Sequence, residues 1–194
     1  MTMSGGGGPL RVVLIGPEST GKTRLVKNLA IHYDIPWSPE YAREYVEGAK
    51  GSVEYSDVEA IGRGQRAVED EALGKAARLG RPLVVLDTDL VSTAVYSRHY
   101  YGDCPEWIEW EAGERLADLY LLLHVDVGWV ADGSQRAQPE RGGELFERFR
   151  SALEELDAQV CEIRGVWRER QQHAIECVDR LVSRTTPHGG KQLN

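Results

Sequence analysis

Residues 11–23 read RVVLIGPESTGKT, an apolar run followed by two glycines that enclose four residues and then by Lys22 and Thr23. In this GxxxxGK[ST] spacing the glycines let the backbone curl, so that successive N–H groups point at one cluster of phosphate oxygens. The motif needs a strand before it and a helix after it, and the flanking patterns supply both. We therefore predict a phosphate-binding loop made of Gly16, Pro17, Glu18, Ser19, Thr20, Gly21, Lys22 and Thr23.

The end of this loop and one later aspartate carry the predicted donor chemistry. Lys22 is expected to reach the β- and γ-phosphates of ATP or a similar triphosphate, and Thr23 to offer its hydroxyl to Mg²⁺. Asp87 directly follows the apolar run at residues 82–86, and a carboxylate at that end of a central strand can hold Mg²⁺. Asp89 is expected either to share the ligand role or to cap the next helix. ATP and Mg²⁺ are the predicted cofactors.

Apolar runs and helical patterns alternate along the rest of the chain. The predicted strands cover residues 11–15, 35–38, 82–86, 119–125 and 159–163. The predicted helices cover residues 22–33, 40–49, 57–78, 89–101, 144–156 and 167–182. This alternation is typical of a parallel sheet covered by helices. The predicted fold class is α/β: a P-loop NTPase or kinase fold with about five parallel strands flanked by helices, and with a lid segment.

Length and charge limit what the chain can be. The 194 residues suit one domain, which we expect over residues 10–183, with flexible tails at 1–9 and 184–194. The balance of 23 basic against 31 acidic residues gives a formal charge of -8, which makes nonspecific nucleic-acid binding unfavourable. A small molecule is therefore the expected partner, and the sequence leaves the oligomeric state open.

The compartment is predicted from the start of the chain and from its cysteines. The glycine-rich start has neither the basic nor the apolar segment of a signal peptide. No apolar run approaches the roughly 20 residues that a membrane-spanning helix needs. Cys104, Cys161 and Cys177 are scattered without metal-ligand spacing, so we expect reduced, mostly structural thiols. These features favour a cytoplasmic protein without a membrane partner.

The segment at residues 36–45, PWSPEYAREY, places charged and aromatic side chains after the second predicted strand. A carboxylate there can accept a proton from an attacking hydroxyl, and rings can stack on a base. We predict Glu40 as the general base, with Asp87 as the other candidate. The substrate-binding candidates are Trp37, Glu40, Tyr41, Arg43, Asp87 and Asp89. The competing interpretation is a surface helix on which Arg43 pairs locally.

The polar stretch at residues 126–143 follows the fourth predicted strand, where small-molecule kinases have a mobile lid. It carries Arg136 and Arg141, and lid arginines can neutralise the transferring phosphoryl group and exclude water. Arg136 is also predicted to bind ATP. The alternative is a solvated charged loop.

Four motifs taken in order resemble the ribosylnicotinamide kinase domain of the NadR family. They are GPESTGKT at 16–23, PWSPEYAREY at 36–45, DTD at 87–89 and a WxxDG…R…R lid, and the resemblance covers roughly residues 11–182. It implies an ATP- and Mg²⁺-dependent kinase that phosphorylates the 5′-hydroxyl of nicotinamide riboside to give nicotinamide mononucleotide. Multi-domain family members add nucleotidylyltransferase and DNA-binding regions, which we do not expect in this chain. The lid has one residue more than the family's DG-x-R, so both arginines remain candidates.

Two other classes of function stay open at this point. The acceptor could be another nucleoside or a polynucleotide 5′ end, and the acidic charge disfavours the polynucleotide. The protein could instead be a nucleotide-switched regulatory ATPase. A GTPase would need a guanine-reading NKxD motif, which the sequence lacks.

Overall fold

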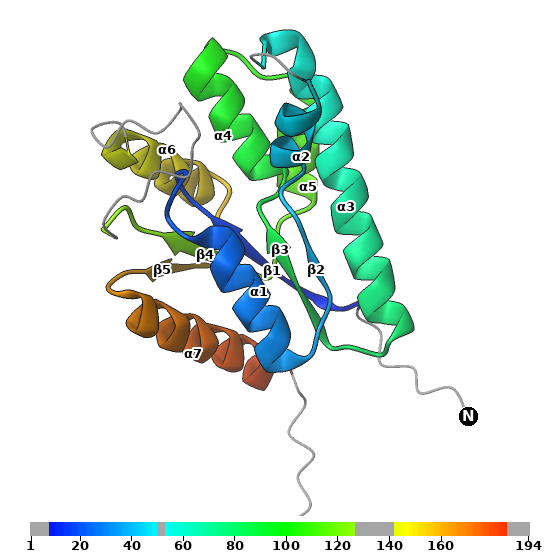
Figure 1. Cartoon of the computed structure of the whole chain (residues 1–194), viewed down its shortest axis with the longest axis vertical. Helices are drawn as coiled ribbons and strands as arrows, with labels where there is room; N and C mark the ends of the chain where they lie inside the picture. The colour runs from blue at the N-terminus through cyan, green and yellow to red at the C-terminus, as the bar shows by residue number, and fades with distance from the viewer. Residues whose placement is uncertain (1–7, 50–52, 127–141, 186–194) are drawn as a thin grey trace, which may run out of the picture.

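The computed structural model describes residues 8–49, 53–126 and 142–185. Five parallel strands form one sheet in the order β2-β3-β1-β4-β5 (Figure 1). The strands are β1 (Leu10–Ile15), β2 (Trp37–Ser38), β3 (Leu83–Asp87), β4 (Leu119–Leu123) and β5 (Val160–Ile163). The helices are α1 (Lys22–Tyr33), α2 (Tyr41–Ala49), the 3-10 turn η1 (Tyr55–Asp57), α3 (Val58–Arg78), α4 (Leu90–Tyr101), α5 (Glu106–Glu114), α6 (Gly142–Glu155) and α7 (Trp167–Thr185). The predicted fold class is confirmed.

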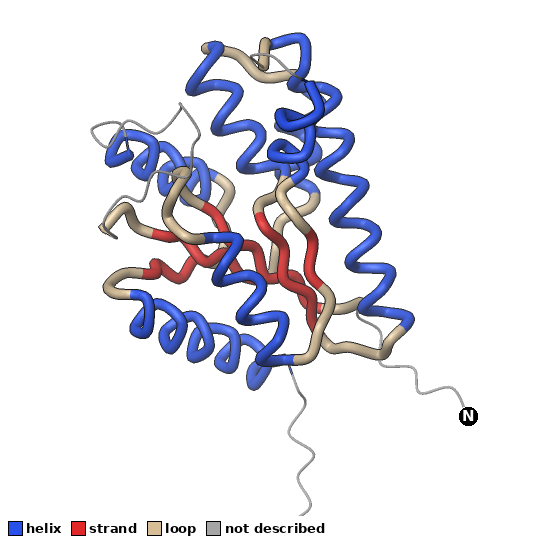
Figure 2. The backbone as a smooth tube through the Cα atoms, in the orientation of Figure 1, coloured by secondary structure: helices blue, strands red, loops and turns tan. Residues whose placement is uncertain are grey.

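Alternate residues of each strand face opposite sides of the sheet, and each side has its own apolar core. On β1, Val12 and Leu14 pack with α1 and α7, whereas Val13 and Ile15 pack with α3, α4 and α6. Figure 1 shows α1 and α7 gathered on one side of the strands, which Figure 2 draws in red. Because the central strands are buried on both faces, they read as continuous apolar runs in the sequence.

The strand order creates a topological switch point at the carboxyl edge of the sheet. Strands β1 and β3 are neighbours, but the helix that follows β1 (α1) and the helix that follows β3 (α4) cover opposite faces. Ligands of open α/β sheets bind at such a switch point, outside the carboxyl ends of the strands. The phosphate-binding loop and Asp87 follow these two strands, so the fold brings them together.

The structure departs from the sequence predictions in three helical details. Helix α5 was not predicted, although Pro105 at its start and the acidic residues of its first turn are helix-start signals. Asp57, with which the predicted third helix begins, occupies the N-cap position of α3, but its side chain makes no cap hydrogen bond to that helix; its carboxylate instead accepts the backbone N–H of Glu54 and closes the preceding 3-10 turn. Helix α7 continues to Thr185, past the predicted end of the domain.

The prediction of reduced thiols is wrong for two of the three cysteines. Cys161 of β5 and Cys177 of α7 form a disulfide, while Cys104 is free and buried. The two cysteines are 16 residues apart in sequence, but they come close together because β5 and α7 pack directly on each other. Within the described ranges, no helix is both long and apolar enough to span a membrane.

Candidate functional site

The phosphate-binding loop depends on its two glycines. Gly16 has φ +134°, and a Cβ there would lie 2.8 Å from the backbone oxygen of Leu123. Gly21 has φ +89°, and its Cβ would lie 3.2 Å from the ring of Trp167. Any other residue would therefore be strained at both positions. The resulting tight turn places the loop at the N-terminus of α1, whose free N–H groups and dipole favour an anion.

Lys22 is folded back over this loop. Its Nζ donates hydrogen bonds of 2.8 Å to the carbonyl oxygens of Gly16 and Pro17, and the residue is only 7% exposed. A buried ammonium needs such partners, because an unpaired buried charge is costly. The loop's own carbonyls thus hold a positive charge at the centre of the predicted phosphate site.

Asp87 ends β3, at the carboxyl edge of the sheet where the sequence placed it, and its side chain lies against the start of α1. The hydroxyl of Thr23 donates a 2.6 Å hydrogen bond to Asp87 Oδ2, and Asp87 is fully buried. Its Oδ1 has no hydrogen-bond partner among the described residues. Burial raises the pKa of Asp87, and the charge of Lys22 and the Thr23 hydroxyl offset this only in part. A buried carboxylate oxygen beside a hydroxyl is a donor set that suits Mg²⁺, which prefers oxygen ligands.

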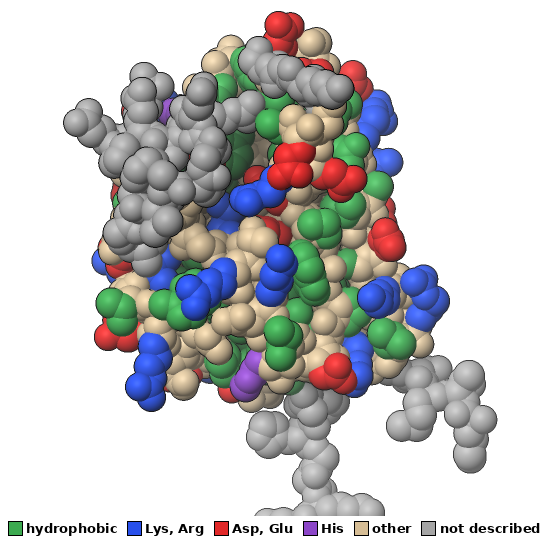
Figure 3. Space-filling view, viewed as in Figure 1, with side chains coloured by type: hydrophobic (Ala, Val, Ile, Leu, Met, Phe, Trp, Pro, Cys, Tyr) green, Lys and Arg blue, Asp and Glu red, His purple; other side chains and the backbone are tan. Residues whose placement is uncertain are grey.

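Glu40 and Arg43 lie at the start of α2, on the side of the molecule where Asp87 ends β3. Their side chains form an ion pair with an N···O distance of 3.6 Å. The negative charge of Glu40 raises the pKa of Asp87 and the positive charge of Arg43 lowers it, so both are within electrostatic reach of that carboxylate. In the space-filling view, acidic and basic side chains meet between α1 and α2 (Figure 3). Arg43 therefore pairs locally, as the surface-helix interpretation expected, and it also lies near Asp87, as the functional interpretation expected.

Asp89 caps helix α4. Its Oδ1 accepts the backbone N–H of Ser92 at 3.3 Å, and its Oδ2 accepts the hydroxyl of Tyr120 at 2.7 Å. The residue is buried, and burial raises the pKa of its carboxyl. Of the two roles left open for Asp89, the cap is the one that the structure displays.

The two predicted aromatic residues have neighbours within the protein. Trp37 packs into the core on the α1 side of the sheet, with Lys27 Nζ 5.5 Å from its ring centroid. Tyr41 donates its backbone N–H to Gln65, and its ring leaves no room for a Cβ at Gly64 of α3. The structure brings Lys22, Thr23, Asp87, Glu40 and Arg43 together by hydrogen bonds and charge, whereas Trp37 packs in the core and Tyr41 packs against α3.

Sequence reasoning missed Tyr96, which helix α4 delivers to the loop. Its hydroxyl donates a 3.3 Å hydrogen bond to the carbonyl oxygen of Gly16. Burial first, and then the charges of Glu18 and Glu40, raise the pKa of Tyr96 well above its ordinary value, so the phenol stays neutral. Tyr100 stacks on it, with ring centroids 6.1 Å apart, and donates to Glu18. The signal was the i,i+4 tyrosine pair on the helix after Asp87.

Sequence reasoning also missed Arg170, whose side chain holds the phosphate-binding loop through a backbone carbonyl oxygen. It is fully buried, and its guanidinium donates to the carbonyl oxygens of Thr20 (2.9 Å), His124 (2.7 Å) and Gly165 (2.8 Å). It also pairs with Asp126. One planar fork thus ties the phosphate-binding loop to the ends of β4 and β5. The signal was an arginine in line with the apolar stripe of α7, four residues before Ala174.

The predicted lid lies mostly outside the described residues. Arg136 and Arg141 both fall within residues 127–141, so their roles remain predictions. The flanks are described: Asp126 accepts the backbone N–H of Gly165 at 2.7 Å as well as pairing with Arg170, and α6 begins at Gly142. The first residue of the predicted lid, Asp126, therefore contacts Arg170, which in turn holds the phosphate-binding loop.

A glycine-rich loop at the switch point of a parallel sheet, with a buried carboxylate on the neighbouring strand, defines a P-loop nucleotide-binding protein. The chain belongs to the AAA domain family, which matches it over residues 11–170. It is 32% identical over 126 residues to the trifunctional NAD biosynthesis/regulator protein NadR of Salmonella typhimurium (strain LT2) and to that of Escherichia coli (strain K12). Each match covers 63% of this chain and 30% of the relative, so the chain spans about a third of the length of these proteins.

Solved structures agree with this assignment. A crystal structure of NadR in complex with NR superimposes with a TM-score of 0.75 at 26% identity, covering 94% of this chain and 54% of the other. NadR in complex with NAD and AMP-PNP gives 0.70, also at 26% identity, with 95% and 52% coverage. Thymidylate kinase from Ehrlichia chaffeensis gives 0.59 at 15% identity, with 90% and 100% coverage, and supports the fold alone. The resemblance to the NadR family is thereby confirmed.

Proposed function

We propose that this protein is an ATP- and Mg²⁺-dependent kinase that transfers the γ-phosphoryl group of ATP to the 5′-hydroxyl of nicotinamide riboside, giving nicotinamide mononucleotide. The observation that carries the proposal is the Thr23–Asp87 hydrogen bond beside the phosphate-binding loop, with the second buried oxygen of Asp87 lacking a hydrogen-bond partner among the described residues. The similarity to NadR, which was crystallised with NR, supports the choice of acceptor. We also propose that the protein is cytoplasmic.

The donor half of the reaction rests on the loop and on α1. The N–H groups of residues 16–23 bind the phosphates, and Lys22 turns its ammonium from the loop carbonyls toward the β- and γ-phosphate oxygens. Thr23 and Asp87 hold Mg²⁺, which supplies positive charge to the phosphate oxygens when it is bound. Arg136 and Arg141 are proposed to add charge from the lid.

The acceptor half rests on the start of α2. Glu40 accepts the proton of the attacking 5′-hydroxyl, because its carboxylate is only partly buried and lies at the start of α2, where it pairs with Arg43. Asp87 is the less suitable base, since its carboxylate is committed to Thr23 and to the metal. Tyr96 contributes a neutral phenol between the two halves, donating toward Gly16.

The test is a product assay. The protein is incubated with ATP, Mg²⁺ and a panel of nucleosides, and phosphorylated products are followed by mass spectrometry. Rapid formation of nicotinamide mononucleotide is the expected result. Phosphorylation of a different nucleoside alone would keep the kinase and reject the nicotinamide assignment. Tight ATP binding without transfer to any small acceptor would favour the polynucleotide kinase or the regulatory ATPase.

A further inference from the structure

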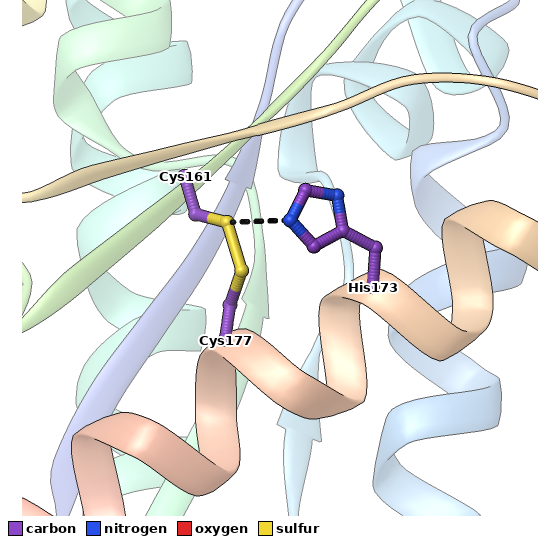
Figure 4. Close-up of side chains that lie close together, drawn as sticks. All are labelled: Cys161, His173 and Cys177. Atoms are coloured by element: carbon purple, nitrogen blue, oxygen red, sulfur yellow. Dashed lines mark hydrogen bonds between the residues drawn. A yellow bond between two sulfur atoms is a disulfide. The ribbon is translucent and has the colours of Figure 1, made fainter.

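A second group of reactive side chains lies between β5 and α7 and is separate from the phosphate site. Cys161 of β5 and His173 and Cys177 of α7 point toward one another (Figure 4). Their ligand atoms all lie within 4.8 Å of one another, and Cys161 Sγ is 3.7 Å from His173 Nε2. None of the three belongs to the phosphate site described above, and the proposed kinase reaction uses none of them.

The donor atoms are those of a zinc-class site. Two thiolate sulfurs and one imidazole nitrogen form a soft donor set that selects zinc and related divalent ions over Mg²⁺. Around a tetrahedral ion with Zn–S and Zn–N bonds of about 2.3 and 2.0 Å, sulfur and nitrogen lie about 3.6 Å apart. The distance between Cys161 Sγ and His173 Nε2 in the structure is 3.7 Å. The site is therefore close to the required geometry along this edge.

The local fold pre-arranges the three ligands. His173 and Cys177 are four residues apart on α7 and so share one face of the helix, as His and Cys pairs in metal sites do. The Cα atoms of Cys161 and Cys177 are 6.6 Å apart, with one residue on the sheet and the other on the helix packed against it. No change of secondary structure is needed for both sulfurs to face one ion.

A neighbouring cation favours the thiolate form that a metal needs. Arg180 Nη2 donates a 3.1 Å hydrogen bond to Cys177 Sγ, and such donors to a ligating sulfur stabilise its negative charge. Cys177 is buried, whereas Cys161 and His173 are half-buried. The exposed side of the cluster leaves access for a water molecule as fourth ligand.

We propose that the reduced chain binds one zinc-class divalent ion through Cys161 Sγ, Cys177 Sγ and His173 Nε2, with water as the fourth ligand. A dithiol reductant first gives two electrons and two protons to the Cys161–Cys177 bond and itself becomes a disulfide. The two thiols then release their two protons to solvent as the ion binds. The disulfide and the metal are alternative links between β5 and α7, because disulfide sulfurs carry no negative charge.

The consequence is structural. Helix α7 also carries Arg170, which holds the phosphate-binding loop through the carbonyl oxygen of Thr20. An ion that binds only the folded chain stabilises it by mass action, so the midpoint of thermal unfolding should rise with the concentration of free zinc.

The experiment uses the full chain, reduced with a phosphine, stripped of metal by a chelator and then titrated with Co²⁺ alone. We expect binding of one ion per chain, with thiolate-to-cobalt charge-transfer and tetrahedral d–d absorption, and displacement by Zn²⁺. Cys161→Ser and Cys177→Ser should remove the charge-transfer band or reduce it by at least half, and His173→Ala should weaken binding about tenfold or more. Cys104→Ser and His32→Ala are the matched controls and should bind as the unmodified chain does.

The oxidised chain provides a further control, because its intact disulfide should prevent cobalt binding. Circular dichroism identifies any variant that does not fold; His173→Ala and Cys161→Ser, at half-buried positions, decide the question if Cys177→Ser is lost. The proposal is overturned if the reduced chain binds no stoichiometric cobalt. It is also overturned if Cys104→Ser lowers the signal as much as Cys161→Ser does.

Discussion

The donor side and the acceptor side of the candidate site are built in different ways. On the donor side, Gly16 and Gly21 are fixed by backbone geometry, and Lys22 and Asp87 are buried and held by short hydrogen bonds. On the acceptor side, Glu40 is held by one ion pair of 3.6 Å with a partly exposed arginine. In the proposed reaction the phosphates would therefore bind a rigid frame, whereas the acceptor would meet side chains that are held less firmly. The difference implies that donor-side changes cost more activity, which the following variants test in order of expected effect.

Lys22→Ala should give the largest loss, because it removes the positive charge that the loop carbonyls hold at the predicted phosphate site. We expect turnover to fall roughly a thousandfold, as for the removal of a group that stabilises transition-state charge. The fold should persist, since the side chain bonds only to loop carbonyls. Steady-state kinetics at saturating ATP measure the effect, with Lys27→Ala on the same helix as control. Turnover equal to that of the unmodified enzyme would contradict the role of Lys22.

Asp87→Asn should lower turnover by roughly a few hundredfold and weaken the Mg²⁺ dependence. The same variant should be no less stable than the unmodified chain without Mg²⁺. Burial raises the folded-state pKa of Asp87, so its contribution to stability is present below the unfolded pKa and is lost as the pH rises through the folded pKa. At neutral pH, asparagine avoids this loss of stability because it does not ionise, and its side-chain oxygen can still accept the hydrogen bond from the Thr23 hydroxyl.

Thermal unfolding with and without Mg²⁺-ATP checks the Asp87 prediction. Mg²⁺-ATP should stabilise the unmodified chain more than the variant, because only the carboxylate binds the metal well. A variant that unfolds several degrees earlier without ligand would show that Asp87 is a structural residue instead.

Glu40→Gln should reduce turnover about a hundredfold, with the KM for ATP nearly unchanged, because a general base acts on the acceptor and not on the donor. Glu47→Gln, on an exposed position of α2, is the control and should leave turnover unchanged. If Glu40→Gln instead raises the KM for ATP with turnover unaffected, Glu40 belongs to the donor side and the proposed division is wrong.

Arg170→Lys tests whether the donor side depends on support from α7. Lysine keeps the charge but loses the planar fork that reaches three carbonyl oxygens, and we expect a loss of stability of about 2 kcal/mol. Urea denaturation measures it, with the exposed Arg168→Lys as control. Stability within about 0.5 kcal/mol of the unmodified chain would mean that the fork is dispensable.

The parts that the sequence predicted are those in which local chemistry determines structure. The GxxxxGK[ST] spacing determines a backbone turn, and the continuous apolar runs determine a doubly covered parallel sheet, so both were predicted. Arg170 and the Cys161–Cys177 pair depend on contacts between distant elements, so their partners were not predictable, although the apolar stripe of α7 indicates that Arg170 is buried. The position of Asp87 was predictable because the carboxyl ends of parallel strands share one edge. The neighbours of Trp37 were not, because one residue of register on a short strand decides which face a ring occupies.

Trp37→Leu should have the smallest effect on the reaction. It tests whether the Trp37 ring belongs to the acceptor site or to the protein core. Trp37 pairs in register with Val85, whose side chain faces α1, and it packs in the same core. Leucine keeps an apolar side chain there but removes the ring, so thermal stability should fall while the KM for the nucleoside changes by less than about twofold. A ring that stacks on the acceptor would instead give a rise of about tenfold, since stacked aromatics contribute about 1 kcal/mol beyond their buried area. Measuring both quantities on one variant separates the alternatives. A raised KM with unchanged stability would move Trp37 into the acceptor site and show that β2 presents its other face to the substrate.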